Sequence, residues 1–376
     1  MHQSKLAGVA VVGALAAAPL IAQQGPAEVD APETPGAVYA EACATCHGAD
    51  GRGASEALLS FEVPMPDFTD CSFASREPDG DWLAVASAGG PVRGFDHMMA
   101  AFGDALTEAE IQKATDHIRT FCRDDAWPRG ELNLPKAIFT EKAFPEDEVY
   151  FLTGATVEGE GSVSGLLVYE KRFGARNQIE VAVPFSFLEA PANAPEAGRW
   201  RGGIGDIGFG LKRVLLSSLG SGSIASLTAE LIVPTGDAGR GFGGDTFVFE
   251  PFLTYGQIVP VIGFVQMQGG FELPFDTAQA ENEWFVRSVI GRNLTAGEWG
   301  RVFSPMLGVL AGGVLSDEPD PSWDLVPQML ITLNTRQHVM LNVGVRLPVT
   351  GAGERDKAVY ALLLWDWFDG GFFEGW

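Results

Sequence analysis

Five consecutive residues, Cys43-Ala44-Thr45-Cys46-His47, carry the clearest chemical signature in the sequence. Two cysteines at this spacing lie one helical turn apart, so both thiols can reach the two vinyl groups of one haem and form thioethers. The imidazole of His47 then meets the iron from the same side. A thioredoxin-like redox pair or half of a zinc site would need partners that the sequence lacks, because it has no second Cys-x-x-Cys pair and no H-x-x-x-H motif. The motif therefore predicts one covalent haem c held by Cys43, Cys46 and His47.

The segment from Pro35 to Arg123 resembles the class I mono-haem cytochromes c. In that family a short helix carries the motif and a glycine-rich turn follows it. The matching residues outside the motif are Gly36, Tyr39, Gly48, Gly51 and Gly53. Farther along, Met99-Ala100-Ala101-Phe102-Gly103, followed by Leu106 and Thr107, is similar to the family's distal Met-Pro-x-Phe-Gly segment. The resemblance implies an all-α cytochrome c domain over residues 35–123.

The resemblance also implies that His47 is the proximal iron ligand and Met99 the distal ligand. The sequence departs from the family pattern at Ala100, where a proline usually follows the ligand methionine. His97 and Met98 stay open as alternative ligands, as does an unligated distal position. A thioether ligand stabilises ferrous iron and raises the reduction potential, so the identity of the distal ligand decides whether the site is a high-potential or a low-potential electron carrier.

The residues alone predict a helix at the end of this domain. Thr107-Glu108-Ala109-Glu110 forms a capping box, and four residues after it fall on one helical face: Ile111, Ala114, Ile118 and Cys122. His117 lies beside that face, where a packed or exposed histidine is expected rather than an iron ligand.

Cys71 and Cys122 are the two cysteines outside the motif. In an exported chain an even pair favours a structural disulfide, with two free buried thiols as the alternative.

The start of the chain predicts export. Lys5 is followed by an apolar stretch from Leu6 to Ala18 and a small-residue exit at Ala22, which is typical of a signal peptide over residues 1–22. An uncleaved transmembrane anchor is the alternative, and the stretch is short for that role. Residues 124–145, rich in proline and glycine near Trp127, are interpreted as a linker.

The remaining residues, 146–376, read as an outer-membrane β-barrel. About a dozen segments of roughly ten residues alternate between apolar and polar residues and are separated by turn residues. In Gln178–Phe187 the apolar side chains would face lipid, and in His338–Leu347 Val343 would face lipid while Asn342 would face the lumen. A polar lumen lining is expected from Glu180, Glu230, Glu250, Lys212 and Arg346. A soluble all-β domain is the alternative; we predict an antiparallel transmembrane barrel of about 12 strands.

The complete arrangement resembles the fused cytochrome porins of iron-oxidising bacteria, with a simpler haem domain and a shorter barrel. Two short pieces, Trp200–Lys212 and Val233–Asp237, are weakly similar to outer-membrane proteins linked to aromatic-compound degradation.

These features predict an electron carrier in the outer membrane, with its haem domain in the periplasm. Its expected partners are periplasmic redox carriers and outer-membrane lipid. The net charge of −24 argues against nucleic acid as a partner. The alternative is a channel for small solutes with the haem domain as redox partner or plug; an enzyme with an open iron position is a third possibility. No catalytic residue is predicted.

Overall fold

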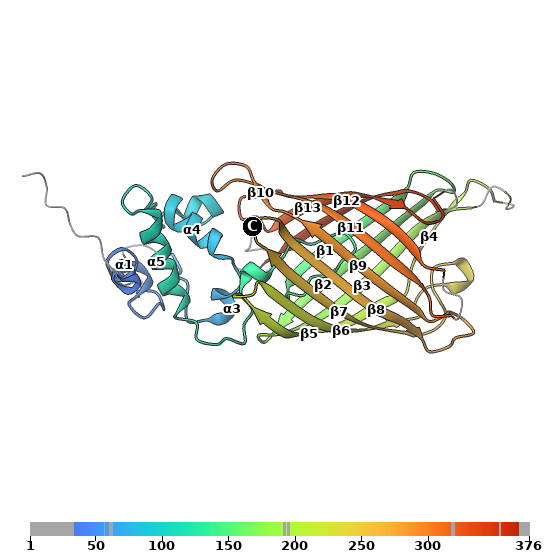
Figure 1. The fold of residues 1–376 in the computed structure, drawn as a ribbon, viewed down its shortest axis with the longest axis horizontal. Coiled ribbons are helices and arrows are strands. Elements are labelled where there is room, and N and C mark those ends of the chain that lie inside the picture. The colour runs from blue at the N-terminus through green and yellow to red at the C-terminus, as the bar shows by residue number, and fades with distance from the viewer. Residues whose placement is uncertain are drawn as a thin grey trace, which may run out of the picture.

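A computed structural model describes residues 34–367 of the chain, except 56, 60–62, 191–192, 194–195, 317–319 and 353–354. The predicted signal peptide lies outside the described residues. Two parts follow one another along the chain, a helical part and a barrel, and the helices gather at one end of the barrel (Figure 1). Within the described residues, no helix is long and apolar enough to cross a membrane.

Among its described residues, the helical part contains five α-helices and two short 3₁₀ helices. They are α1 (Pro35–Ala42), α2 (Ala44–His47), α3 (Cys71–Ala74), α4 (Asp79–Ala88), η1 (Gly90–Arg93), α5 (Glu108–Arg119) and η2 (Gly130–Leu132). The predicted capping box begins α5: the Thr107 hydroxyl accepts a hydrogen bond from the Glu110 amide, and the Glu110 carboxylate accepts one from the Thr107 amide. The apolar face of α5 buries Ile111 and Ala114, so α5 completes the small core of this domain.

In the part of the chain that the structure describes, fourteen strand segments form the barrel. They are β1 (Asp147–Thr156), β2 (Ser162–Phe173), β3 (Asn177–Glu189), β4 (Trp200–Ile204), β5 (Ile207–Ser218), β6 (Ser223–Val233), β7 (Val248–Val259), β8 (Gly263–Pro274), β9 (Glu283–Gly291), β10 (Leu294–Thr295), β11 (Val302–Val314), β12 (Ser322–Thr332), β13 (Val339–Pro348) and β14 (Ala358–Asp366), with the 3₁₀ helix η3 (Ala238–Arg240) between β6 and β7. Both β4 and β5 pair with β3, and both β9 and β10 pair with β11, so the segments make twelve strands. The last strand, β14, pairs with β1 and closes the sheet. The prediction of a helical domain followed by an antiparallel barrel of about 12 strands is confirmed.

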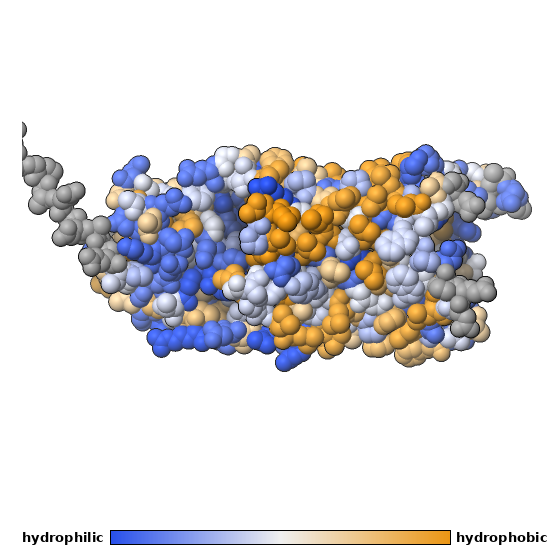
Figure 2. Space-filling model, in the orientation of Figure 1, coloured by the Kyte–Doolittle hydropathy of each residue, from blue (hydrophilic) through white to orange (hydrophobic). Residues whose placement is uncertain are grey.

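The two faces of the barrel differ as the alternation predicts. Large apolar side chains point outward, among them Leu167, Phe209, Leu253, Leu307 and Leu363. Polar side chains at alternate positions are buried inside, among them Gln178, Lys212, Thr254, Gln268 and Asn342. Figure 2 shows apolar residues spread over the barrel wall, whereas the helical domain is mostly hydrophilic.

The helical domain is joined to the barrel by close polar contacts. The Arg76 guanidinium binds Asp147 at the start of β1 (2.5 Å), and the imidazole Nε2 of His338 lies 3.0 Å from a carboxylate oxygen of Glu77.

Within the helical part, the Gly130 amide donates to the Ser75 carbonyl (2.7 Å). A Cβ at position 130 would lie 2.0 Å from the Arg76 carbonyl oxygen, so only glycine permits this approach of the two chain segments.

Candidate haem site and barrel lumen

The three residues of the haem motif lie at the junction of two helices. Pro35 occupies the first turn of α1, and the Thr34 side chain accepts a hydrogen bond from the Ala37 amide, so the sequence begins the helix there. Cys43 ends α1 and begins α2, and Cys46 and His47 lie within α2. The thiols of Cys43 and Cys46 are half-buried and take part in no disulfide.

The glycine-rich turn after the motif folds back on α2. The Gly53 amide donates to the His47 carbonyl (2.9 Å), and the Ala54 amide donates to the Cys46 carbonyl (2.8 Å). The buried Tyr39 hydroxyl donates to the Gly48 carbonyl (2.6 Å) and anchors the turn to α1. Gly51 has φ +76°, and a Cβ there would lie 2.7 Å from the Phe121 ring, so a side chain at this position would push the turn away from α5.

His47 has the properties of a metal ligand. Burial lowers the pKa of its imidazole, so the ring is neutral at pH 7, which is the form that binds a metal. The ring stacks on Phe68 with 5.0 Å between centroids, and its Nδ1 is buried without a hydrogen-bond partner among the described residues. Burial, followed by the charge of Cys46, raises the pKa of Cys43 to about 11. A covalent haem requires two adjacent free thiols for its vinyl groups and a neutral imidazole for its iron. Cys43, Cys46 and His47 therefore fit haem c.

The three candidate distal ligands differ in exposure. The imidazole of His97 is 83% exposed and lies 3.1 Å from an Asp96 carboxylate oxygen, and Met98 is 41% exposed. Met99 is partly buried, and its carbonyl accepts a hydrogen bond from the Gly90 amide (2.9 Å). Among the three candidates, Met99 is the side chain most withdrawn from solvent.

Cys71 and Cys122 form a disulfide that ties α3 to the chain just after α5. Arg119, on α5, reinforces the same junction: its Nε lies 2.7 Å from an Asp79 carboxylate oxygen, and its guanidinium lies over the Trp82 ring at 4.3 Å. His117 contacts the rings of Tyr39 and Phe121 at centroid distances of 5.0 and 5.1 Å. His117 is thus a packed residue of the helix interface.

The segment expected to be a linker enters the barrel and fills part of its lumen. We call residues 132–146 the lumen segment. Its apolar residues pack on the inner wall: Leu134 and Ala137 contact a cluster of Phe264, Val289, Met306 and Leu330 from four strands, and Leu132, Ala143 and Phe144 contact Val214 and Ile224. Exposure of these apolar side chains to water would be unfavourable in free energy, and the barrel interior buries them.

Side chains of the barrel wall also bind the backbone of the lumen segment. Gln266 donates to the Pro135 carbonyl (2.8 Å) and Asn342 to the Lys136 carbonyl (3.0 Å). In return, the amides of Ile138, Glu141 and Glu146 donate to Gln328 (2.8 Å), Gln268 (3.1 Å) and Gln178 (2.7 Å). The segment has no strand partner, so these amide side chains satisfy backbone groups that burial would otherwise leave unpaired.

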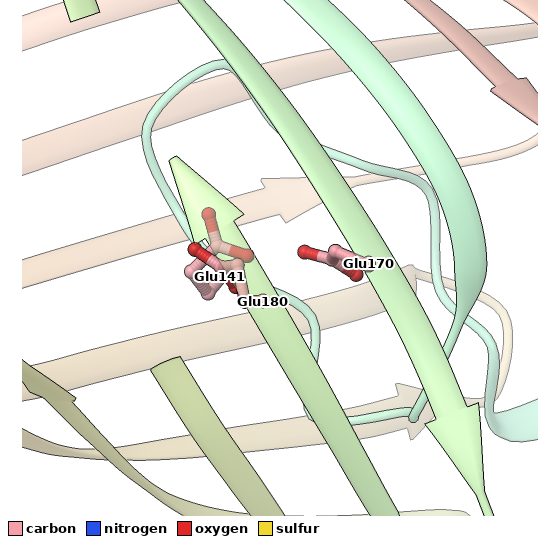
Figure 3. A group of neighbouring side chains, drawn as sticks. All are labelled: Glu141, Glu170 and Glu180. Atoms are coloured by element: carbon pink, nitrogen blue, oxygen red, sulfur yellow. The ribbon is translucent and has the colours of Figure 1, made fainter. Parts of the chain in front are cut away.

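Charged groups cluster where the lumen segment meets β2 and β3. A carboxylate oxygen from each of Glu141, Glu170 and Glu180 lies within 4.8 Å of the others, and Figure 3 shows Glu141 beside Glu180 with Glu170 facing both. The ammonium group of Lys136 lies 2.6 Å from Glu141, and Lys212 interacts electrostatically with all three carboxylates. Two lysines therefore supply counter-charge inside the lumen.

The sequence predicts part of the lumen lining but not the lumen segment. The predicted lumen-lining residues are all buried or half-buried on the inner face: Glu180, Glu230, Glu250, Lys212 and Arg346. The missed signal was the apolar content of residues 132–144, which is high for an exposed linker.

Comparisons with known proteins find similarities for each of the two parts of the chain. Residues 30–118 match the sequence profile of the family described as cytochrome C oxidase, cbb3-type, subunit III. The structure is similar to an outer membrane channel from Pseudomonas putida F1, at 13% identity and a TM-score of 0.45, covering 62% of this chain and 99% of that one. It is also similar to the KdgM porin, at 9% identity and a TM-score of 0.37, covering 58% and 98%. No curated protein matches the chain significantly.

The chain thus joins a cytochrome c domain to a closed barrel of 12 antiparallel strands. A cytochrome c domain implies haem c as its cofactor and electron transfer as its general activity.

Proposed function

We propose that the chain carries one haem, bound covalently through Cys43 and Cys46, and transfers single electrons at the periplasmic side of the outer membrane. The observation that carries the proposal is the motif geometry: two unpaired thiols beside the neutral, half-buried imidazole of His47. When bound, the haem supplies reversible one-electron chemistry. The protein's part is to hold it, to ligate it and to keep its surroundings dry.

The proposed ligands are His47 on the proximal side and Met99 on the distal side. The exposure of Met98 and His97, together with the hydrogen bond between Gly90 and the Met99 carbonyl, supports Met99 over its neighbours. Two protein ligands leave iron no open position, so an electron relay is favoured over an enzyme.

An outer-membrane location with a periplasmic haem domain is supported by the barrel wall and its connections. Its outward face is apolar, as contact with lipid requires. The connections at 174–176, 219–222 and 260–262 are at the end near the helical domain, whereas the longer ones at 234–247 and 275–282 are at the other end. Bacterial barrels place short turns in the periplasm and long loops outside.

The filled lumen favours an anchor over a solute channel. The lumen segment binds wall residues of β3, β8, β12 and β13, so a solute would have to displace it. The proposed partners are therefore periplasmic redox carriers that meet the haem domain, with lipid around the barrel.

Replacing either motif cysteine tests the proposal. Cys43→Ala and Cys46→Ala each remove one thioether, so haem staining of denaturing gels should fall sharply in each, with Ser72→Ala as an unaffected control. The proteins should be produced together with a cytochrome c maturation system. Full staining of both cysteine variants would contradict covalent attachment at this motif.

A further inference from the structure

The loop that carries Met99 leaves α4 and returns to it. At its base the Gly90 amide donates to the Met99 carbonyl (2.9 Å), and the Phe102 amide donates to the Ala86 carbonyl of α4 (3.0 Å). Inside the loop, the Phe95 amide donates to the Gly90 carbonyl (3.0 Å). We call residues 90–101 the distal loop. Among the described residues, the amides of Gly94, Phe95 and Met98 at its tip donate to other residues of the loop and not to the helices, so contacts from outside the loop affect its position.

One outside contact runs through Arg93, which is buried in the distal loop. Its Nε lies 2.6 Å from an Asp81 carboxylate oxygen on α4. Its Nη1 donates to the Trp299 carbonyl (2.8 Å), in the barrel connection between β10 and β11. One guanidinium thus links the cytochrome helix, the distal loop and the barrel through charge-assisted hydrogen bonds.

A second contact covers the tip of the distal loop. Arg336, in the connection between β12 and β13, donates to the Gly94 carbonyl (3.4 Å), and its guanidinium carbon lies 4.6 Å from the centroid of the Phe95 ring. Gly94 has φ +71°, and a Cβ there would lie 3.4 Å from the Cγ of Arg336. The barrel side chain therefore lies directly against the turn of the loop.

We infer that Arg336 is a positioning residue for the distal ligand, so that the barrel helps to set how firmly Met99 binds iron. This inference rests on the proposed function. Release of Met99 from iron requires the distal loop to move. We call the loop conformation described above the closed loop. Contacts made only in the closed loop favour the state in which Met99 is bound to iron. The barrel therefore has a role in the redox site in addition to anchoring it.

The test uses the full-length, haem-loaded protein in detergent and the binding of imidazole to the ferric form. Imidazole competes with Met99, so its apparent affinity reports the stability of the closed loop. Loss of a guanidinium–aromatic contact at an exposed site should raise that affinity about two- to fivefold in Arg336→Ala. The matched control is Arg240→Ala, since that guanidinium lies over the Phe242 ring at 5.3 Å in a connection at the opposite end of the barrel.

Phe95→Ala and the double variant Phe95→Ala/Arg336→Ala complete the experiment. If the two residues act through their contact, the effect of the double variant is smaller than the product of the two single effects. Phe95→Ala leaves every barrel residue unchanged. It therefore tests the contact even if the barrel of the Arg336→Ala variant folds poorly.

Unchanged imidazole affinity in Arg336→Ala, with the Met–iron absorption band intact, would overturn the inference and leave the proposed function standing. A double variant whose effect equals the product of the single effects would also overturn it. Absence of the Met–iron band from the unmodified protein would instead contradict the proposed ligation itself.

Discussion

At the scale of single residues, Met98 and Met99 offer the sharpest test of iron ligation. Met99→Ala should abolish the Met–iron band and lower the midpoint potential, because ferrous iron loses a soft ligand. Met98→Ala should change both properties much less, since that residue is more exposed to solvent than Met99. Visible spectra and a potentiometric titration measure the two effects. If the variants exchange these behaviours, Met98 is the ligand.

Tyr39 should make the stability of the helical domain depend on pH. Burial, the largest cause, raises the pKa of its hydroxyl above the ordinary value of 10.0; in the chain before haem attachment the charges of Cys43 and Asp50 add to this effect and the pKa is about 12. Because the folded pKa is the higher one, this contribution to stability is complete below pH 10 and is lost as the pH rises toward 12. Tyr39→Phe should lose about 1 kcal/mol near neutral pH and show a smaller decline above pH 10 in denaturant unfolding. An equally steep decline in the variant would exclude Tyr39 as its source.

The haem motif could be predicted at this scale because its chemistry is local. The spacing of Cys43, Cys46 and His47 along the chain is sufficient to identify the thiols and the first ligand. The distal side is different, because burial distinguishes Met99 from Met98 and depends on how the loop packs against α4. The sequence around two adjacent methionines does not show which of them the folded loop buries.

At the scale of elements, β13 tests which face of a strand meets lipid. Val343 is 41% exposed in the middle of the strand, so Val343→Arg should cost about 2 to 4 kcal/mol if it lies near the bilayer midplane. Val261→Arg is the control, because Val261 lies in the turn between β7 and β8 and is 91% exposed. Heat-modified migration on gels and denaturant unfolding in lipid vesicles report the loss. Equal tolerance of the two changes would argue for a soluble barrel.

The alternation along the strands predicted the barrel and its two faces, but it could not predict the contents of the lumen. Alternation alone assigns Asn342 to a solvated lumen, where an arginine would be tolerated. In the structure Asn342 is fully buried and donates to the Lys136 carbonyl and to Gln328 (2.9 Å), so Asn342→Arg would displace the lumen segment. The segment is placed by long-range packing, and residues 132–146 have no strand or helix periodicity that reveals it.

At the scale of the whole molecule, the lumen segment should keep the barrel closed to solutes. The unmodified protein should show little conductance in planar bilayers. Replacing Gln328 and Asn342 by alanine removes hydrogen bonds to Ile138 and Lys136, each contributing about 0.5 to 1.5 kcal/mol, so the double variant should open more often. Gln257→Ala, at the end of β7 near the helical domain, is the control. Steady, large conductance of the unmodified protein would favour the channel alternative.

The proposed redox centre lies in a domain fixed to the end of a closed barrel, and we propose that this centre exchanges single electrons reversibly. The most direct measurement is a spectroscopic redox titration of the full-length protein purified in detergent. We expect haem that stays on the chain after denaturation, a Met–iron band in the ferric form and one reversible one-electron step. Haem lost on denaturation, or the absence of a reversible one-electron step, would contradict it.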